Sequence, residues 1–329
     1  MPLDAPQAGQ SDWLDDVQAS PVAQRLVSCS YPAGTTIFRE GEPGDTFLFI
    51  VSGDAEVRRA DTVVAHLGAG SVVGELALLT GTSRTTTVVA GTRLIGRLGT
   101  ALDFADLLES DSIRAHFTHL AASRLAANVK PVAFSGKSGF LGELRPLLPT
   151  DRPEYTKLIS RLSPESRRRR FFTATVPSPH LIDYLLNVDF VDHFAWVALD
   201  RSTDPHQGCG IARFIRNDVD IHSAEAAFAV VDSHQGIGIG TTMLGALAVA
   251  AEASAITTFT AEVLDDNTPM RKVFEKVGAI WTRPDRGILR AEMSVADTLV
   301  LLDPALRDAL VESSSGIGLA ASTALRLTD

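Results

Sequence analysis

Cysteine and long apolar runs are both scarce in this sequence. Only Cys29 and Cys209 occur among 329 residues, so the chain has no disulfide framework and no zinc-ligand spacing. No apolar run approaches the ~20 residues that cross a bilayer. The first twenty residues are acidic and lack the basic start and apolar stretch of a secretory signal. These absences predict a cytoplasmic protein with no metal site and no membrane partner.

Positive charge is also in short supply. The formal net charge is -10, whereas binding to a nucleic acid requires clustered lysine and arginine. No helix-turn-helix pattern with a basic recognition helix follows Lys130. A transcription factor, or any partner made of nucleic acid, is therefore disfavoured.

The composition that remains is that of a globular protein with more than one core. Hydrophobic residues make up 45% and charged residues 21% of the chain. At roughly 150 residues per domain, a chain of this length predicts about two domains.

The first half reads as a β domain followed by a helix. Between Tyr31 and Leu98, short runs of β-forming residues alternate with glycines, which is typical of an antiparallel barrel or jelly roll. From Phe104 to about Lys130 the apolar residues follow a helical period, and Pro131 ends it.

One cassette inside the β domain has the residue types of an anion pocket. Gly74-Glu75-Leu76-Ala77 predicts a short helix N-terminus, and Arg84 follows shortly after. Free N-H groups and a guanidinium both favour a phosphate, whereas a carboxylate would repel it, so Glu75 is suited to accept a hydrogen bond from a sugar hydroxyl. The alternative is that Glu75 and Arg84 form a surface ion pair in a domain without a ligand.

Together with Gly41-Glu42, Gly44-Asp45 and Gly53, this cassette resembles that of the cyclic-nucleotide-binding domains. The resemblance implies that Glu75 holds a ribose hydroxyl and Arg84 a cyclic phosphate. The expected ligand is cAMP. Thr85 stands where threonine can favour guanine, which keeps cGMP as an alternative.

The second half alternates strands and helices and contains a glycine string. Ala227-Val231 ends a strand, Gln235-Gly236-Ile237-Gly238-Ile239-Gly240 forms a turn, and an alanine-rich helix follows. Such a turn can bring backbone N-H groups against a pyrophosphate. A dinucleotide fingerprint, in which the loop follows the first strand of a unit, is the alternative. Here the loop comes late in its domain, and the next strand is followed by Asp265-Asp266-Asn267.

With Asn267 and the segment 273–279, the second half resembles the GCN5-related N-acetyltransferase (GNAT) fold. The resemblance implies an acetyl-CoA site in which the strand binds the pantetheine arm and the turn binds the pyrophosphate. Phe274 stands where many relatives have a tyrosine that protonates the leaving thiolate, and it otherwise reads as a core aromatic residue. The implied acetyl-CoA residues are Phe228, Ala229, Val230, Gln235, Gly236, Ile237, Gly238, Ile239, Gly240, Thr241, Asn267 and Lys276.

The chemistry of amine acetylation calls for a base. A lysine amine with a pKa of ~10.4 is only about 0.04% neutral at pH 7, which costs roughly 4.6 kcal/mol. Glu225 opens the strand that leads to the glycine turn. We expect its partial burial among apolar neighbours to raise its pKa toward neutrality, which suits a general base. The alternative is a solvated carboxylate on an edge strand.

The run Leu162-Ser163-Pro164-Glu165-Ser166, followed by four arginines and Phe171-Phe172, resembles a helix of the bacterial protein lysine acetyltransferases. Ser163 caps the predicted helix and Pro164 is its first residue. Arg167 to Arg170 read either as a solvated last turn or as a face that binds an acidic protein or the 3′-phosphate of CoA.

The whole arrangement resembles the mycobacterial cyclic-AMP-dependent protein lysine acetyltransferases. We therefore expect a multidomain α+β protein: a regulatory jelly roll with helices at 1–130, a linker at 131–139, a GNAT domain with a mixed central sheet at 140–297 and a tail at 298–329. The implied partners are proteins with an acceptor lysine, acyl-CoA synthetases among them. A small-molecule amine acetyltransferase and a non-catalytic sensor remain open. Either the segment 160–189 or the tail 303–329 is expected to cover the acceptor cleft when the sensor is empty.

Overall fold

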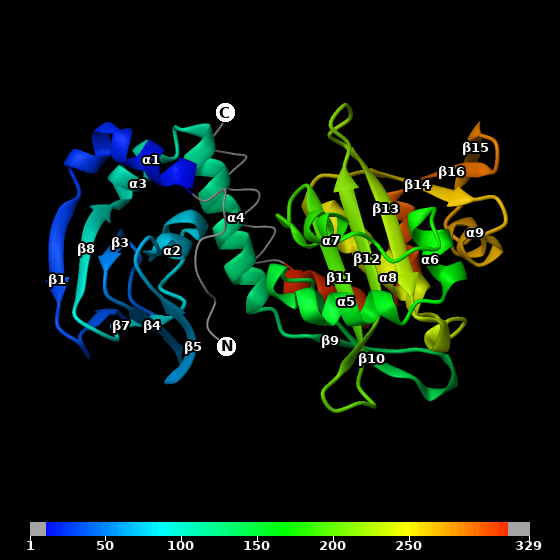
Figure 1. The fold of residues 1–329 in the computed structure, drawn as a ribbon, viewed down its shortest axis with the longest axis horizontal. Coiled ribbons are helices and arrows are strands. Elements are labelled where there is room, and N and C mark those ends of the chain that lie inside the picture. Colours follow the sequence, from blue (N-terminus) through cyan, green and yellow to red (C-terminus); the bar gives the residue numbers. More distant parts are fainter. Residues whose placement is uncertain (1–10, 315–329) are drawn as a thin grey trace. The chain divides into compact units, whose positions relative to one another are not determined.

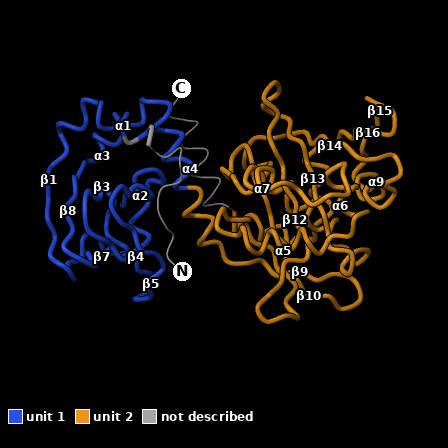
Figure 2. The backbone as a smooth tube through the Cα atoms, in the orientation of Figure 1, with its two compact units in different colours: residues 1–121, 322–329 blue, residues 122–321 orange. Residues whose placement is uncertain are grey.

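The computed structural model describes residues 11–314, which form two compact units (Figures 1 and 2). The first unit runs to Ala121 and the second begins at Ala122, so the boundary falls inside helix α4. Each unit has its own sheet system. Within the described residues, every helix is too short or too polar to cross a membrane.

The first unit contains two four-stranded antiparallel sheets, in the orders β1-β8-β3-β6 and β2-β7-β4-β5. Their inner faces share one core, to which Leu48 and Ile50 of one sheet and Val88 and Ala90 of the other contribute. This confirms the expected β jelly roll. The strands are β1 (Val27–Tyr31), β2 (Thr36–Phe38), β3 (Thr46–Ser52), β4 (Ala55–Arg59), β5 (Thr62–Leu67), β6 (Val72–Val73), β7 (Thr87–Ala90) and β8 (Leu94–Thr100).

The helices of this unit are α1 (Ser11–Ala19), α2 (Glu75–Thr80), α3 (Ala101–Leu107) and α4 (Asp111–Ala127). The single helix expected from Phe104 to Lys130 is thus two helices. The break falls at Leu108-Glu109-Ser110, and Ser110, Asp111 and Ser112 are residue types that favour helix caps over helix interiors. Thr100 and Asp103 form a capping box at the start of α3.

The second unit is built on one eight-stranded sheet, in the order β15-β16-β14-β13-β12-β11-β10-β9. All neighbours are antiparallel except β13 and β14, which are parallel. This is the mixed sheet expected of a GNAT domain. The strands are β9 (Val132–Ser135), β10 (Leu141–Pro146), β11 (His193–Asp200), β12 (Gln207–Arg216), β13 (Ser223–Val230), β14 (Thr258–Leu264), β15 (Ile280–Asp285) and β16 (Ile288–Ser294).

Helices cover both faces of this sheet. Helix α8 packs on β11, β12 and β13, and its alanines allow so close an approach that Trp196 donates a hydrogen bond to the Ala246 carbonyl at 3.0 Å. On the opposite face, α5 packs on β12 and α6 on β13 and β14. The helices are α5 (Arg152–Ser160), α6 (Pro164–Phe171), α7 (Pro179–Leu186), α8 (Ile239–Ala253), α9 (Thr268–Glu275) and α10 (Val295–Thr298).

The expected linker and tail contain more structure than the sequence indicated. Segment 131–139 includes β9, which pairs with β10 and extends the sheet. Val132 and Phe134 supply the apolar alternation of a half-buried strand. Residues 304–314 are helical, and Leu310 is fully buried in the core of the second unit. The rest of the expected tail, 315–329, lies outside the described residues.

Candidate functional site

Strands β13 and β14 pair only at their beginnings. Ser223, Ala224 and Glu225 are opposite Thr258 to Thr260, whereas β13 stays paired with β12 up to Val230. Beyond Glu225, no described strand pairs with the β14 side of β13. Main-chain groups along that edge are therefore open to a ligand that lies along the strand.

A cavity of about 450 Å³ follows this open edge. It is bounded by β13, the glycine turn, the start of α8, helix α6 and helix α9. Every acetyl-CoA residue implied by the sequence lines it except Ile237. The Ile237 carbonyl instead accepts a hydrogen bond from the Lys137 amide at 2.8 Å, and its side chain packs against the core.

The glycine turn presents backbone N-H groups to the cavity. Gly236 and Gly238 have φ values of +79° and +101°, a region that residues with a side chain rarely adopt. Gly238 is the N-cap of α8, so the first N-H groups of a 15-residue helix have no partner within the helix. This end of the cavity is suited to an anion.

The charges around the cavity all have one sign. Lys137, Arg169, Arg170, Lys272 and Lys276 line it, and no aspartate or glutamate belongs to its described lining. The protein as a whole has a net charge of -10, so this basic cavity is a local exception. The lining fits the three phosphates of a CoA ester.

Two of the implied residues have structural partners within the site. Asn267 is 3% exposed, and its side-chain oxygen accepts a hydrogen bond from the Met270 amide and so caps α9. Lys276 donates to the Thr241 hydroxyl at 3.1 Å. The side chain of Asn267 therefore fixes the N-terminus of α9, while the ammonium group of Lys276 lies at the start of α8.

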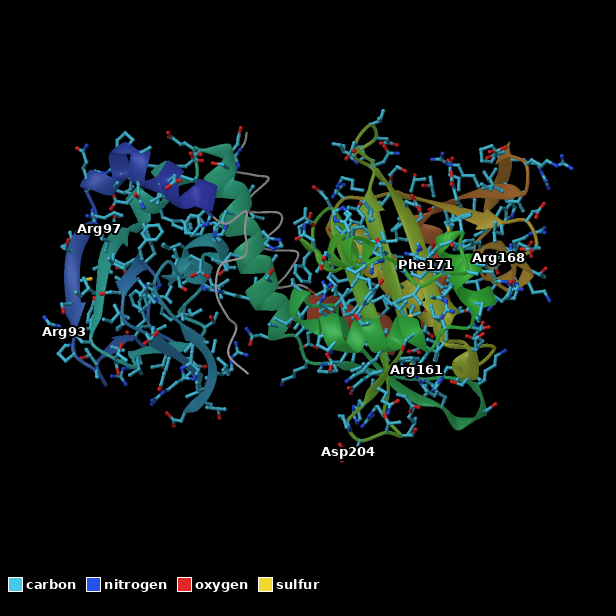
Figure 3. All side chains as sticks on the ribbon, viewed as in Figure 1. Arg93, Arg97, Arg161, Arg168, Phe171 and Asp204 are labelled. Atoms are coloured by element: carbon cyan, nitrogen blue, oxygen red, sulfur yellow. The ribbon has the colours of Figure 1, made fainter. Side chains whose placement is uncertain are left out.

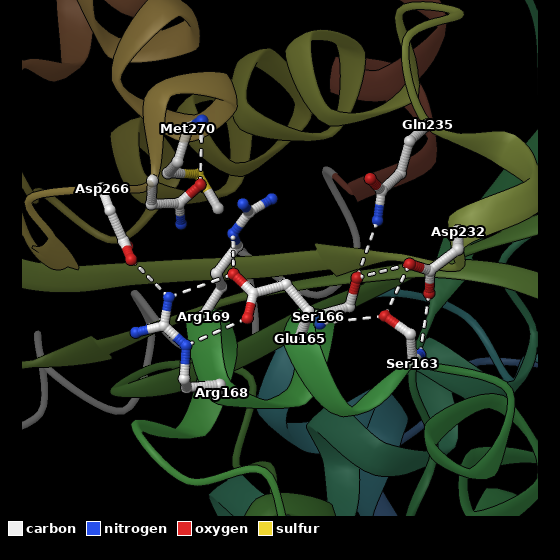
Figure 4. A network of polar contacts seen from close by, with 10 residues as sticks. Ser163, Glu165, Ser166, Arg168, Arg169, Asp232, Gln235, Asp266 and Met270 are labelled. Atoms are coloured by element: carbon white, nitrogen blue, oxygen red, sulfur yellow. Dashed lines mark hydrogen bonds and ion pairs between the residues drawn. The ribbon is translucent and has the colours of Figure 1, made fainter.

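Helix α6 is joined to the loop that precedes the glycine turn. Asp232 accepts hydrogen bonds from the Ser163 amide and hydroxyl and from the Ser166 hydroxyl, at 2.7 to 2.8 Å. Gln235 in turn donates to the Ser166 hydroxyl (Figure 4) and to the Val230 carbonyl, at 3.0 Å each. Burial alone would raise the pKa of Asp232, but these hydrogen bonds lower it below its usual value.

The four arginines of α6 are not a solvated last turn, because each is partly buried. Arg167 donates to the Leu162 and Ala174 carbonyls. Arg168, which is labelled in Figure 3, pairs with Glu165 and Asp266 (Figure 4), and the Nε of Arg169 lies 2.9 Å from Glu165. Arg169 and Arg170 line the cavity. Ser163 caps the helix by accepting from the Ser166 amide, as the sequence predicts.

In the first unit, Arg84 and Glu75 are brought together by the cassette that the sequence singled out. Arg84 is 6% exposed and donates to the Gly74 carbonyl at 2.9 Å and to the Thr46 hydroxyl at 3.0 Å. Its guanidinium lies 4.0 Å from the centre of the Phe38 ring. Burial lowers the pKa of Arg84, against the opposing effect of nearby acidic groups.

Glu75 is 1% exposed and begins α2, with Gly74 at φ +91° before it. Ala77 is buried, and Leu76 and Thr85 are partly buried. Because Glu75 and Arg84 are both buried, the structure rules out a surface ion pair.

Comparisons with known proteins match both units. A cyclic-nucleotide-binding domain model matches residues 28–111, and a GNAT acetyltransferase domain model matches residues 143–280. The acetyltransferase Pat of Mycolicibacterium smegmatis is 35% identical over 300 residues, which is 89% of this chain and 89% of that protein. The chain belongs to the Pat acetyltransferase family. It is a cyclic-nucleotide-regulated N-acetyltransferase.

Of two further matches, the first spans nearly the whole chain and agrees with the Pat family, and the second covers about a quarter of it and agrees with the cyclic-nucleotide-binding domain. A solved structure, a cAMP-binding acyltransferase from Mycobacterium smegmatis, superposes with a TM-score of 0.51 at 33% identity, covering 92% of this chain and 91% of that one. The regulatory subunit of a cAMP-dependent protein kinase from Aspergillus fumigatus is 40% identical over 89 residues, which is 26% of this chain and 22% of that protein.

Within the acetyltransferase unit, Glu225 is exposed and does not belong to the cavity lining. The expectation that apolar neighbours partly bury the Glu225 carboxylate is therefore wrong. Ala224 and Ala226 point to the opposite face of β13, toward α8, whereas Glu225 points to the face that α6 covers. There its charged neighbour is Arg170.

Sequence reasoning missed a buried polar cluster on the same face. Arg213 is 2% exposed and donates to the Leu185 carbonyl at 2.6 Å, and it lies 2.8 Å from the Nε2 atom of His193 and 3.4 Å from the Tyr155 hydroxyl. Burial lowers the pKa of Arg213 to about 10. The available signal was a lone arginine within the apolar run Gly210-Ile215.

Phe274 is a core residue. It is 1% exposed, contacts the rings of Phe228 and Trp281, and does not line the cavity. No phenol can therefore act from this position.

We predict that His193 makes this acetyltransferase sensitive to mild acid. Burial and the adjacent Arg213 lower the pKa of His193 from 6.5 to about 3. Between these values the unfolded chain binds a proton that the folded chain does not, so stability falls as pH falls. From pH 6.5 to 5, this group should contribute a loss of roughly 2 kcal/mol, at 1.36 kcal/mol per unit.

Urea unfolding at both pH values, followed for the native protein and for His193→Gln, measures this effect. Glutamine keeps an acceptor for Arg213 but does not titrate, so the variant should lose about 2 kcal/mol less than the native protein. Equal losses in the two proteins would show that His193 is protonated in the folded state.

Proposed function

We propose that the chain is a cAMP-controlled protein lysine N-acetyltransferase, which moves acetyl from acetyl-CoA to the ε-amine of a lysine. One observation carries the proposal: a basic cavity follows the open edge of β13 and is lined by Arg170, a charged neighbour of Glu225, in a chain that also holds a buried Arg84 in a cyclic-nucleotide cassette.

The cavity lining divides into two parts that suit the two ends of acetyl-CoA. The N-H groups from Gly236 to Thr241, with Lys272 and Lys276, meet the phosphates. The open edge at Phe228, Ala229 and Val230 offers main-chain hydrogen bonds to the amide-bearing arm. Acetyl-CoA supplies an activated thioester, and the protein fixes its orientation.

Glu225 is the proposed general base. Its exposed carboxylate stands where β13 and β14 begin to separate. A lysine that enters from solvent can therefore give it a proton, directly or through a water. An exposed base also suits an acceptor lysine on the surface of a target protein. The long lysine side chain can reach Glu225 while the rest of the target stays outside the site.

The proposed regulatory ligand is cAMP, with Arg84 on the cyclic phosphate and Glu75 on the ribose hydroxyl. A ligand at 100 times its dissociation constant supplies at most about 2.7 kcal/mol. If the empty sensor favours a form in which segment 160–189 or the tail 303–329 covers the acceptor site, that preference must be of this size or smaller. Activation by cAMP should then be large but finite.

Acetyl transfer to a purified acyl-CoA synthetase, with and without cAMP, tests the proposal. Mass spectrometry should find acetyl on a lysine of the target, and cAMP should raise the initial rate more than cGMP does. Free polyamines and aminoglycosides are the comparison acceptors. Transfer to these alone would show a small-molecule acetyltransferase.

Calorimetric titration with acetyl-CoA separates the remaining alternative. A non-catalytic sensor would bind cAMP but not acetyl-CoA. Binding of both ligands without transfer to any lysine would reject the proposed acceptor while leaving the donor site intact.

A further inference from the structure

Arg170 is the one arginine of α6 for which the described residues provide no hydrogen bond or ion pair. Its guanidinium lies 5.0 Å from the centre of the adjacent Phe171 ring and lines the cavity. Arg167, Arg168 and Arg169 all have carbonyl or carboxylate partners. A partly buried guanidinium has several N-H donors to satisfy, and at this position they face the donor cavity.

Helix α6 runs alongside β13 in the opposite direction, which places Arg170 at a definite end of the cavity. Ser166 is bonded to Asp232 and Gln235, which follow the end of β13. Arg170 lies four residues after Ser166, about 6 Å along the helix axis. It interacts electrostatically with Glu225, which is near the start of β13. Arg170 is thus at the reacting end of the cavity, away from the glycine turn.

The reaction creates negative charge at that end. When the amine attacks the acetyl carbon, the C-S bond breaks and its electron pair goes to sulfur. Phe274 has no hydroxyl and is buried behind Phe228. The hydroxyl of Ser166 is already bonded to Asp232. Arg170 is the charged cavity residue near Glu225, and no carboxylate among the described residues pairs with it. Its positive charge can therefore interact with the negative charge on sulfur.

We propose that the guanidinium of Arg170 binds the sulfur of the donor and stabilises it as the thiolate leaves. This inference rests on the proposed function and deepens it. The C-N bond forms as the C-S bond breaks, and the amine proton goes to Glu225. The thiolate stays paired with Arg170 until water protonates it. Arginine keeps its own proton throughout, so it acts as a fixed charge and not as an acid.

Steady-state kinetics on the full-length protein with saturating cAMP provide the first readout. Arg170→Gln should lower kcat by about 10²- to 10³-fold, the usual effect of removing one donor to a developing charge, with a small change in the KM for acetyl-CoA. Arg170→Lys keeps the charge without the planar fork, so we expect it to recover part of kcat. Arg168→Gln, on the same helix but outside the cavity, should leave kcat within about threefold of native.

The second readout is binding of CoA and of desulfo-CoA from pH 6.5 to 9, which needs no turnover. A site that stabilises a thiolate should bind CoA more tightly than desulfo-CoA as pH rises, by about tenfold if the thiol pKa falls by one unit. The native protein and Arg168→Gln should show this rise, and Arg170→Gln should not.

The inference is overturned if Arg170→Gln retains the pH-dependent preference for CoA. Equal weakening of CoA and desulfo-CoA with kcat unchanged would place Arg170 on a phosphate instead. Absence of lysine acetylation by the native protein would reject the proposed function, but the binding comparison would still report on the sulfur contact. The two failures are therefore distinguishable.

Discussion

Replacing Glu225 by glutamine should lower the rate of lysine acetylation by about 10²- to 10⁴-fold at pH 7, the usual contribution of a general base. Glutamine has nearly the same shape and can still accept a hydrogen bond, but it takes no proton. The reaction must then wait for lysines that are already neutral. The initial rate with saturating cAMP and acetyl-CoA measures the loss, and the KM for acetyl-CoA should change little because Glu225 is outside the donor cavity.

The pH dependence of this variant distinguishes a base from a structural carboxylate. Without a base, the rate should rise about tenfold per pH unit toward the lysine pKa of ~10.4, following the neutral fraction of the acceptor. The native enzyme should rise less steeply over the same range.

Glu292→Gln is the matched control. Glu292 is also exposed, and Thr260 of β14 pairs with both Glu225 and Glu292, so the two carboxylates belong to one row of the sheet. This control should retain native activity. If Glu225→Gln also does, the proton leaves by another route.

Replacing Arg84 by lysine should weaken cAMP binding by about 30- to 150-fold, since a charge-assisted bidentate contact is worth roughly 2 to 3 kcal/mol. Lysine preserves the positive charge but cannot place two parallel N-H groups on a phosphate. It also cannot bond the Gly74 carbonyl and the Thr46 hydroxyl together, as Arg84 does. Calorimetric titration measures the dissociation constant.

The activity of the same variant tests the regulatory role. The rate without cAMP should match native, and the concentration of cAMP that half-activates should rise in parallel with the dissociation constant. Arg93→Lys, an exposed arginine in the same unit, is the control and should behave as native. Native activation of Arg84→Lys at native cAMP concentrations would place the nucleotide elsewhere.

Local patterns in the sequence predicted two features of the second unit correctly. The alanine-rich α8 and the Ser163 cap of α6 depend on neighbouring residues alone. Segment 131–139 was harder, because Val132 and Phe134 form a strand only when β10 lies beside them. The helix expected from Phe104 to Lys130 failed for a local reason, a cluster of cap-forming residues that interrupts the apolar period.

The sequence by itself determined the two cassettes and the family, because glycines at positive φ, a cap and a spaced arginine are local requirements that few other arrangements satisfy. Only the tertiary structure decided which side chains share an environment. It exposed Glu225, buried Arg213 beside His193, and turned Arg170 toward the donor cavity. Burial and charge at a site come from segments that are distant in sequence, such as α6 against β13, and no local pattern encodes that pairing.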